Sequence, residues 1–458
     1  MQKFDVVVIG TGAGTKLVRP IADLGFKVAV IEKGALGGTC LNRGCIPSKM
    51  LIHSADVMSE IKEAEKFEID VEGSINVRFQ ELINRVSSTV DQDSASIKPV
   101  YDKHPNITLF QEQASFVDTH TIQAGNHVIQ ADKFFIATGT RPFIPSIPGL
   151  DQTPFMTSNE ALRLSSLPKR LLVIGGGFVA LELGYFYASL GTQVTFIVRD
   201  KLLKNEDQDV VVTFEKLFAQ KHQLALGHTP LFVGHENGIF DVMTQDKSKK
   251  RHVFQAESLL VATGVRPNTD DLQLDKAGIE SNEKGYIKVN SFLQTSAPHI
   301  WALGDVIGRY FFRHSANFEA EYLMKSCYVE QTPFEIKYPF MPYAVFTNPQ
   351  VARLGYTQQE LERDKKPFVV GLNLYQSSAM GMALRSQDEF AKVLIDPVTR
   401  KLWGAHIVGK EAATMMHMFI AFEKMGATLD EMLDTIYIHP AMPEILRNAL
   451  RKAKAQLP

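Results

Sequence analysis

The most constraining feature of the sequence is a strand–turn–helix–strand pattern that occurs twice. VVVIGTGAG followed by IADLGFKVAVIE, which ends at Glu32, recurs as LLVIGGGFVALELG followed by YASLGTQVTFIV, which ends at Val198. Each copy reads as an apolar strand, a Gly-rich turn, a helix and a second apolar strand, which is the βαβ unit of parallel sheets. The repeat predicts an α/β chain with two Rossmann-like dinucleotide-binding domains.

Further repeated segments mark where these domains end. FIATGTRP at 135–142 and LVATGVRP at 260–267 each read as a closing strand with a Pro-directed exit. IWALGDV at 300–306 predicts a strand that returns to the first domain, and FAKVLID with KLWGAHIVG predicts antiparallel strands in a last α+β domain. We therefore expect a first domain at 1–147, a second at 148–265, a central segment at 266–335 that returns to the first, and a C-terminal domain at 336–458.

The first Gly-rich turn has the features of a dinucleotide site. Gly10 and Gly12 permit a tight turn whose backbone N–H groups can approach a pyrophosphate at the N-terminus of the following helix. Glu32 lies where a carboxylate would bind a ribose hydroxyl. Because Thr15 occupies the third glycine position, we expect a looser contact between this helix and its strand.

The second turn indicates which nucleotide it binds. It completes the pattern with Gly175, Gly177 and Ala180. Alignment of the two copies places Val198 at the position of Glu32, with Arg199 next and Lys201 and Lys204 close by. Because a 2′-phosphate is repelled by a carboxylate and attracted by cations, this site favours NADPH over NADH. The alternative is a solvated cationic surface at a strand end.

The segment GGTCLNRGCIPSK at 37–49 holds two of the three cysteines, Cys40 and Cys45. Residues five apart on a regular helix are slightly too distant for a disulfide, but the glycines around this pair can form a tight turn that enters a helix. A helix N-terminus also favours thiolates. A metal centre is the alternative, but it needs four ligands and only Cys327 remains, in a helical-looking run. We therefore favour a redox-active pair and expect no metal site.

Composition narrows the function further. With 45% hydrophobic residues and a net charge of -2, the chain has ample core material and no global attraction for nucleic acid or anionic membranes. The apolar run that begins at Leu171 is interrupted by Glu182 and several glycines, which argues against a membrane span. Three cysteines cannot build a disulfide framework of the secreted kind, so we expect a cytoplasmic protein with small-molecule partners.

Taken together, these motifs resemble the flavin-dependent pyridine nucleotide-disulfide oxidoreductases, the family that includes dihydrolipoamide dehydrogenase, glutathione reductase and mycothione reductase. The resemblance spans the whole chain and includes GGTCLNRGCIPSK, ATGVRPN, IWALGDV and the C-terminal IHPAMPE. It implies a homodimer held by the C-terminal domain. IGTGAGT, RHSANFEAE and HPAMPEI are most like mycothione reductase, whereas CIPSK and GGTCLN are as much like dihydrolipoamide dehydrogenase.

The resemblance also implies roles for individual residues. FAD would be held by Gly10, Gly12, Gly14, Glu32, Lys33, Gly38, Thr39, Lys49, Thr138, Gly139, Arg141, Gly304, Asp305 and Ala316. The nicotinamide nucleotide would be held by Gly175, Gly177, Ala180, Val198, Arg199, Lys201 and Gly264. The implied catalytic residues are Cys45 next to the flavin, Cys40 exchanging with substrate, Lys49 paired with Glu182, and the acid/base pair His439 and Glu444 of the other subunit.

The implied reaction passes hydride from NADPH through FAD to a Cys40–Cys45 disulfide and then to a small disulfide substrate. One alternative is an NAD-dependent dihydrolipoyl dehydrogenase, which could serve a 2-oxo acid dehydrogenase complex. A second is a non-catalytic flavoprotein that binds NADPH as a redox sensor. Two positions depart from the family pattern, because Arg43 stands where the relatives usually carry Val and Ala441 replaces the usual Thr.

Overall fold

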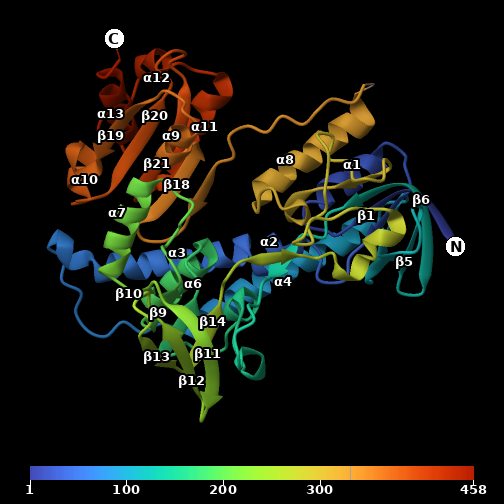
Figure 1. The fold of residues 1–458 in the computed structure, drawn as a ribbon, viewed down its shortest axis with the longest axis horizontal. Coiled ribbons are helices and arrows are strands. Elements are labelled where there is room, and N and C mark those ends of the chain that lie inside the picture. Colours follow the sequence, from blue (N-terminus) through green and yellow to red (C-terminus); the bar gives the residue numbers. More distant parts are fainter. Residues whose placement is uncertain (331, 458) are drawn as a thin grey trace.

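The computed structural model describes residues 1–330 and 332–457, and its first sheet is built around the first βαβ unit (Figure 1). The strand order is β3 (Ile107–Phe110), β2 (Val28–Ile31), β1 (Gln2–Ile9), β6 (His127–Ile136), β5 (Thr121–Ala124) and β4 (Ala114–Phe116). The first four strands are parallel to one another, β5 is antiparallel to β6, and β4 is antiparallel to β5. In β1 the apolar residues 6–9 are all buried, as expected for a strand covered on both faces.

Helix α1 (Thr15–Asp23) follows the first turn and packs closely on the sheet. A Cβ atom on Gly14 would lie 2.2 Å from the Gly10 carbonyl oxygen and 2.8 Å from Val8 Cγ1. Our expectation that Thr15 loosens this contact is therefore wrong, since Gly14 makes the close approach. Thr15 instead begins the helix and donates its hydroxyl to Gly12 O at 2.9 Å.

The second βαβ unit forms its own parallel sheet. The strand order is β10 (Gln223–Leu226), β9 (Gln193–Val198), β8 (Arg170–Ile174) and β14 (Ser258–Val261). Helices α6 (Phe178–Ser189) and α7 (Gln208–Ala219) belong to this part, as does the antiparallel sheet of β11 (Thr229–Glu236), β12 (Ile239–Gln245) and β13 (Arg251–Ala256). Helix α6 is apolar on nearly every side and buries nine of its residues, because it lies between other elements of the fold.

Two short pairings join these parts. Strands β7 (Thr140–Pro142) and β15 (Val265–Pro267), from the two repeated ATG-x-RP segments, pair antiparallel with each other. Strand β16 (Ile300–Ala302) then pairs parallel with β6, so the chain returns to the first sheet. Helix α8 (Arg313–Met324) packs against α1 on this sheet (Figure 1).

The helices between the two nucleotide units carry the cysteines. Helix α2 (Gly38–Arg43) ends at Gly44, and α3 (Cys45–Lys62) begins immediately after it. Helix α4 (Phe79–Asp102) packs against α3, while the short α5 (Ser158–Ala161) precedes β8. In Figure 1, α2 lies near the middle of the molecule, and α3 extends from it toward the left, between the C-terminal domain and the second nucleotide unit.

The C-terminal part is an antiparallel sheet flanked by helices. The strand order is β17 (Tyr343–Val345), β18 (Gln350–Gly355), β21 (Leu402–Gly409), β20 (Phe390–Ile395) and β19 (Val369–Leu374). Its helices are α9 (Gln358–Arg363), α10 (Ala379–Ala383), α11 (Ala412–Met425), α12 (Leu429–Asp434) and α13 (Pro443–Lys454). The predicted fold class, two Rossmann-like units and a C-terminal α+β domain, is confirmed.

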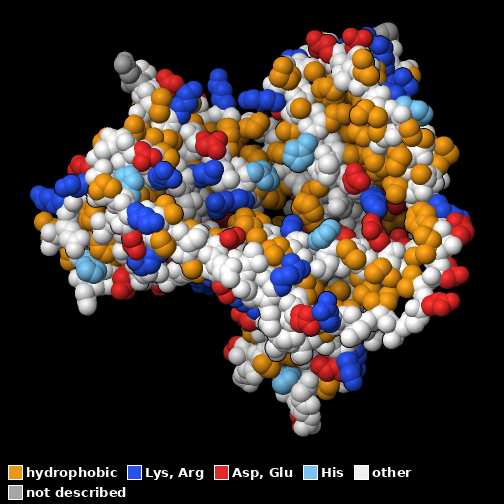
Figure 2. Space-filling model, turned by 180° about the vertical axis from the view of Figure 1, so that it is seen from behind, with side chains coloured by type: hydrophobic (Ala, Val, Ile, Leu, Met, Phe, Trp, Pro, Cys, Tyr) orange, Lys and Arg blue, Asp and Glu red, His pale blue; other side chains and the backbone are white. Residues whose placement is uncertain are grey.

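This C-terminal domain leaves apolar side chains uncovered. Val398, Met425, Ile436 and Ile438 are each more than three-quarters exposed. Figure 2 shows hydrophobic side chains gathered over the domain at the upper right of that view. Exposed apolar surface of this extent marks an interaction face. Among the residues that the structure describes, no helix combines the length and hydrophobicity that a membrane crossing requires.

Candidate active site

A cavity of about 650 Å³ opens at the carboxyl ends of the first sheet's strands and extends to the cysteine segment and α6. It brings together most of the residues predicted to hold FAD. Those lining it are Gly10, Gly12, Glu32, Lys33, Gly38, Thr39, Lys49, Thr138, Gly139, Arg141, Gly304, Asp305 and Ala316. Cys40, Cys45 and Glu182 line it as well.

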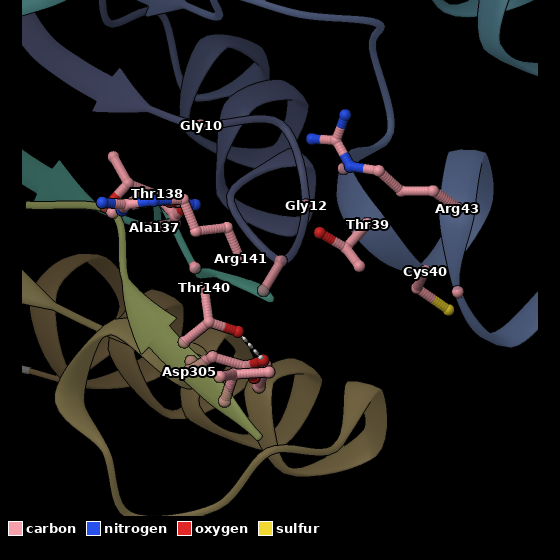
Figure 3. Close-up of a pocket in the computed structure, with 18 of the residues that line it drawn as sticks. Gly10, Gly12, Thr39, Cys40, Arg43, Ala137, Thr138, Thr140, Arg141 and Asp305 are labelled. Carbon is pink, nitrogen blue, oxygen red and sulfur yellow. Dashed lines mark hydrogen bonds between the residues drawn. The ribbon is translucent and has the colours of Figure 1, made fainter. Parts of the chain in front are cut away.

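The floor of the cavity is backbone that tolerates no side chain. Gly10 has a φ of +96°, and a Cβ there would lie 2.4 Å from the Ala137 carbonyl oxygen. A Cβ on Gly38 would lie 2.5 Å from the Cα of Gly12. Figure 3 shows the Thr39 hydroxyl directed toward Gly12. This arrangement leaves backbone N–H groups near the start of α1 open to a pyrophosphate.

Glu32 follows β2 and is held in place by three hydrogen bonds. Its Oε2 accepts from the Thr11 backbone N at 2.9 Å and from the Thr11 hydroxyl at 2.8 Å, and its Oε1 accepts from Gly34 N at 2.9 Å. The carboxylate therefore fixes the Gly-rich turn while it faces the cavity where a ribose would lie.

The opposite wall presents polar groups that suit the same ligand. Asp305 accepts a hydrogen bond from the Thr140 hydroxyl at 3.0 Å (Figure 3). Burial raises the pKa of Asp305, and the Thr140 hydrogen bond opposes this shift. The Thr138 hydroxyl is buried and has no hydrogen-bond partner within the described parts of the chain. An unpaired buried hydroxyl and a cradle without side chains both fit a dinucleotide with hydroxyl and phosphate groups, so the residues present fit FAD.

The cysteine pair lies where two helices meet. Cys40 belongs to α2 and Cys45 begins α3, and Gly44 between them has φ -146° and ψ -116°, which interrupts the helix. A Cβ on Gly44 would approach the Thr39 carbonyl oxygen to 2.9 Å. This break brings the two thiols close enough for each to shift the pKa of the other. Both are free thiols in this structure, so it shows the reduced form of the predicted disulfide pair.

The two thiols differ in acidity. The hydrogen bond from Cys40 is the largest cause that lowers the pKa of Cys45 to about 7; burial opposes it, and the positive charges of Lys49 and Arg313 support it. The same hydrogen bond and burial raise the pKa of Cys40 above its ordinary value. Cys45 is therefore the thiolate of the pair, and Cys40 carries the shared proton.

Lys49 joins the cysteine helix to α6 through an ion pair. Its Nζ lies 2.5 Å from Glu182 Oε2, and Glu182 is 4% exposed. The second oxygen, Oε1, accepts from the Phe346 backbone N at 3.0 Å, and the Phe346 ring lies 4.6 Å from Lys49 Nζ. Burial raises the pKa of Glu182, and Lys49 opposes this shift. The ammonium is thus held on the cavity side of α3.

The second Gly-rich turn lies outside this cavity, although α6 that follows it lines the cavity with Phe178 and Val179. A Cβ on Gly175 would lie 2.3 Å from the Ala262 carbonyl oxygen, whereas Gly177 has open space around it. Val198 is buried at the end of β9. The other residues predicted for this nucleotide are Ala180, which is buried, and Arg199, Lys201 and Gly264, which are exposed.

His439 and Glu444 form a pair in the C-terminal domain, away from the cavity of their own chain. His439 Nδ1 lies 3.0 Å from Glu444 Oε2, and the His439 side chain is 72% exposed. Glu444 also accepts from Arg447 Nη2 at 2.7 Å. The buried carboxylate can orient the imidazole while its other nitrogen faces outward.

Arg313 and Phe346, in and near the cavity, were not predicted from the sequence, and Arg43 was noted there only as a departure from the family pattern. Arg313 lines it, and its Nη1 would lie 4.0 Å from a Cβ on Gly12. Arg313 belongs to the RHSANFEAE segment that carried part of the resemblance, where only Ala316 was assigned a role. Arg43 lines the cavity from α2 and is visible in Figure 3. Phe346 carried no signal, because its role depends on contacts with residues far away in the chain.

The fold and the site together define an oxidoreductase with two dinucleotide units and a dithiol in its cofactor cavity. A family model described as pyridine nucleotide-disulphide oxidoreductase matches residues 4–320, and a model of the dimerisation domain of the same family matches residues 341–450. The chain therefore belongs to the pyridine nucleotide-disulphide oxidoreductase family, which depends on FAD and NAD(P)H.

Individual relatives cover nearly the whole chain. Mycothione reductase of Mycobacterium tuberculosis is 31% identical over 465 residues, covering 98% of this chain and 99% of the relative. Dihydrolipoyl dehydrogenase 3 of Haloarcula marismortui is 30% identical, covering 98% and 96%. Among solved structures, the Cu(II) complex of the HOCl-induced flavoprotein disulfide reductase RclA from Escherichia coli matches with a TM-score of 0.88 and 27% identity, covering 98% and 99%.

Proposed function

We propose that this protein reduces a small disulfide with electrons from NADPH, using Cys40 and Cys45 as the exchanging pair. The observation that carries the proposal is that Cys40 and Cys45 both line the cavity that fits FAD, beside the ion-paired Lys49. The chemistry that bound FAD supplies is transfer of an electron pair between the nicotinamide nucleotide and the protein disulfide.

The dithiol then acts on the substrate by exchange. Cys40 gives its proton to His439 of the partner subunit and attacks one substrate sulfur; the substrate S–S bond breaks, and the leaving sulfur takes that proton from the imidazole. The Cys45 thiolate next attacks the Cys40 sulfur of the mixed disulfide, which closes the protein disulfide and releases the second substrate sulfur as a thiolate that takes a proton from water. The net change is one disulfide reduced to two thiols and one dithiol oxidised. Lys49 keeps Cys45 anionic between these steps.

The role of the partner subunit can be tested by complementation. Homodimers of Cys40→Ser and homodimers of His439→Gln should each be nearly inactive. A heterodimer of the two chains contains one site with both substitutions and one site with neither, so we expect about half of the wild-type turnover per dimer. An inactive heterodimer would show that His439 acts within its own chain.

The preference for NADPH rests on the end of β9. Val198 is apolar and buried where Glu32 stands in the first unit, and Arg199, Lys201 and Lys204 are exposed beside it. Arg199→Ala should raise the KM for NADPH about tenfold and leave the KM for NADH unchanged, because only NADPH carries the 2′-phosphate. Wild-type protein that oxidises NADH much faster than NADPH would contradict this assignment.

A further inference from the structure

A second cavity, of about 570 Å³, lies beside the cysteine pair. It is lined by Cys45, Ile46, Lys49, Met50 and His53 of α3 and by Arg85 of α4. Cys45 and Lys49 line both cavities, whereas Cys40 lines only the first. A molecule in the second cavity therefore borders Cys45 directly and lies next to the segment that carries Cys40, without entering the space that fits FAD.

The spacing of residues along α3 explains why five of them line the same side of the second cavity. Cys45, Lys49 and His53 are four residues apart, so they share one helix face, and Ile46 and Met50 form the adjacent row. Ile46 is 39% exposed, although it is a large apolar residue. The wall thus offers apolar surface close to a thiol and a basic side chain two turns further along.

Helix α4 holds Arg85 at a fixed place. Ile83 and Val86 of α4 are buried in the same core cluster as Ile52 and Ala55 of α3. Arg85 precedes Val86 and is exposed, so its side chain leaves the packed face and borders the cavity. The packing of two long helices therefore fixes the backbone position from which the Arg85 side chain extends.

The cavity carries an unbalanced positive charge. Lys49 is neutralised by Glu182, but no carboxylate in the described parts of the chain forms an ion pair with Arg85. Glu81, one turn earlier on α4, pairs with Arg78 at 2.9 Å. No aspartate or glutamate is among the described residues that line this cavity. Its open charge therefore belongs to Arg85, and His53, whose acidic neighbour is Asp56 one turn along α3, adds hydrogen-bond capacity.

We propose that this second cavity binds a carboxylate of the disulfide substrate, with Arg85 and His53 recognising the charge and with Ile46 and Met50 packing against the substrate's apolar stem. The inference rests on the proposed disulfide exchange and deepens it by naming the substrate class: a small disulfide that carries a negative charge a few bonds from its sulfurs. The fork of donors on Arg85 matches a carboxylate, and the hydrogen bonds between the two are charge-assisted.

The first test measures the charge preference of the thiols without turnover. The FAD-loaded protein is reduced with dithiothreitol, freed of excess reagent, and treated with two methanethiosulfonates that carry a sulfonatoethyl or a trimethylammonioethyl group. Each protein thiolate forms a new S–S bond and methanesulfinate leaves. Peptide mass spectrometry gives the labelling rate at Cys40 and Cys45. Arg85→Glu should lower the anion-to-cation rate ratio at least about tenfold at low salt, because it reverses one charge beside the reacting sulfur.

The matched control is Arg78→Glu on the same helix. Arg78 is exposed and lies outside both cavities, so the ratio should change less than about twofold. Because Arg85 is also exposed, its substitution leaves the core of α4 intact. An Arg85→Glu variant whose ratio stays within about twofold of the wild type would overturn the inference.

The second test separates this inference from the proposed function. Lipoate and lipoamide share one cyclic disulfide and differ in charge, so the ratio of their kcat/KM values reports recognition of the carboxylate. Arg85→Gln should lower the lipoate-to-lipoamide ratio about fivefold, mainly by raising the KM for lipoate. If the labelling ratio changes in the Arg85→Glu variant but the protein reduces no disulfide, the proposed function is refuted and the charge preference is not. If the protein reduces disulfides but neither the labelling ratio nor the lipoate-to-lipoamide ratio changes on substitution of Arg85, the inference is refuted and the proposed function is not.

Discussion

Lys49 and Glu182 lie 133 positions apart in the chain, yet Lys49 Nζ and Glu182 Oε2 are 2.5 Å apart. The pair connects the helix that begins at Cys45 with the helix that follows the second Gly-rich turn. Because Glu182 is buried, its charge depends on this partner, and Lys49 in turn lowers the pKa of Cys45. The electrostatics of the thiol pair are therefore tied to the nucleotide unit that carries α6.

Lys49→Met should make Cys45 less acidic. Removal of the ammonium takes away a charge that favours the thiolate, so the pKa of Cys45 should rise above 7 toward the ordinary thiol value. The measurement is the pH dependence of Cys45 alkylation by iodoacetamide. Lys98→Met, which removes an exposed ion pair on α4, is the control and should leave the midpoint unchanged.

Cys40→Ala should raise the same midpoint further, because the hydrogen bond from Cys40 is the largest cause of the low pKa of Cys45. In the wild type the alkylation midpoint of Cys45 should lie near pH 7. The thiolate is thus the major form above pH 7 and is lost as the pH falls below it. Cys327→Ser, at a half-buried position packed against the core, should not move the midpoint. An unchanged midpoint in Cys40→Ala would refute the assigned thiol contact.

Gly38→Ala should abolish FAD retention. A Cβ added to Gly38 would lie 2.5 Å from the Cα of Gly12. Because this neighbour is a backbone atom, one of the two turns would have to move, and the cradle would open. We expect the flavin absorbance per protein after gel filtration to fall below about a tenth of the wild-type value. Gly25→Ala is the control, since Gly25 also has a positive φ, +95°, but no atom lies within 4 Å of its Cβ position. It should cost only about 1 kcal/mol of stability and retain FAD.

Comparison of the structure with the sequence-based expectations shows which features could be predicted and which could not. The βαβ repeats, the turn glycines and the break at Gly44 follow from local patterns, because glycine spacing and apolar runs fix the turns they form. The contact expected at Thr15 is the exception, since the close helix–strand approach is made one residue earlier, by Gly14. Arg85 and Phe346 could not be assigned, because each lies far in sequence from the groups it borders.

Buried ionic groups outside the site were also missed. His406 of β21 is fully buried 4.0 Å from Asp207, and Asp207 pairs with the buried Lys392 at 2.8 Å. These residues join the turn before α7 to strands β20 and β21 of the C-terminal sheet. A polar cluster of this kind arises from the packing of two domains, so no local sequence pattern predicts it.

Glu206, beside this cluster, predicts a pH dependence of stability. Burial raises its pKa to about 7, and its Oε2 has no hydrogen-bond partner among the described residues. The unfolded chain loses this proton near the ordinary glutamate value, so the folded state binds more protons between that value and pH 7, and stability falls as the pH rises through this window. Glu206→Gln should therefore raise the Tm at about pH 8 and leave it nearly unchanged at about pH 4, as scanning calorimetry can measure. An equal effect at both pH values would contradict the assigned pKa.

The most direct test of the account is disulfide-dependent oxidation of NADPH by FAD-loaded Cys40→Ser protein. The variant should keep its flavin, because Cys40 is not part of the glycine cradle, and its turnover should fall about a thousandfold or more. Full turnover in Cys40→Ser, or wild-type protein that is colourless after purification, would contradict the central claim that this dithiol carries electrons from the flavin to the substrate.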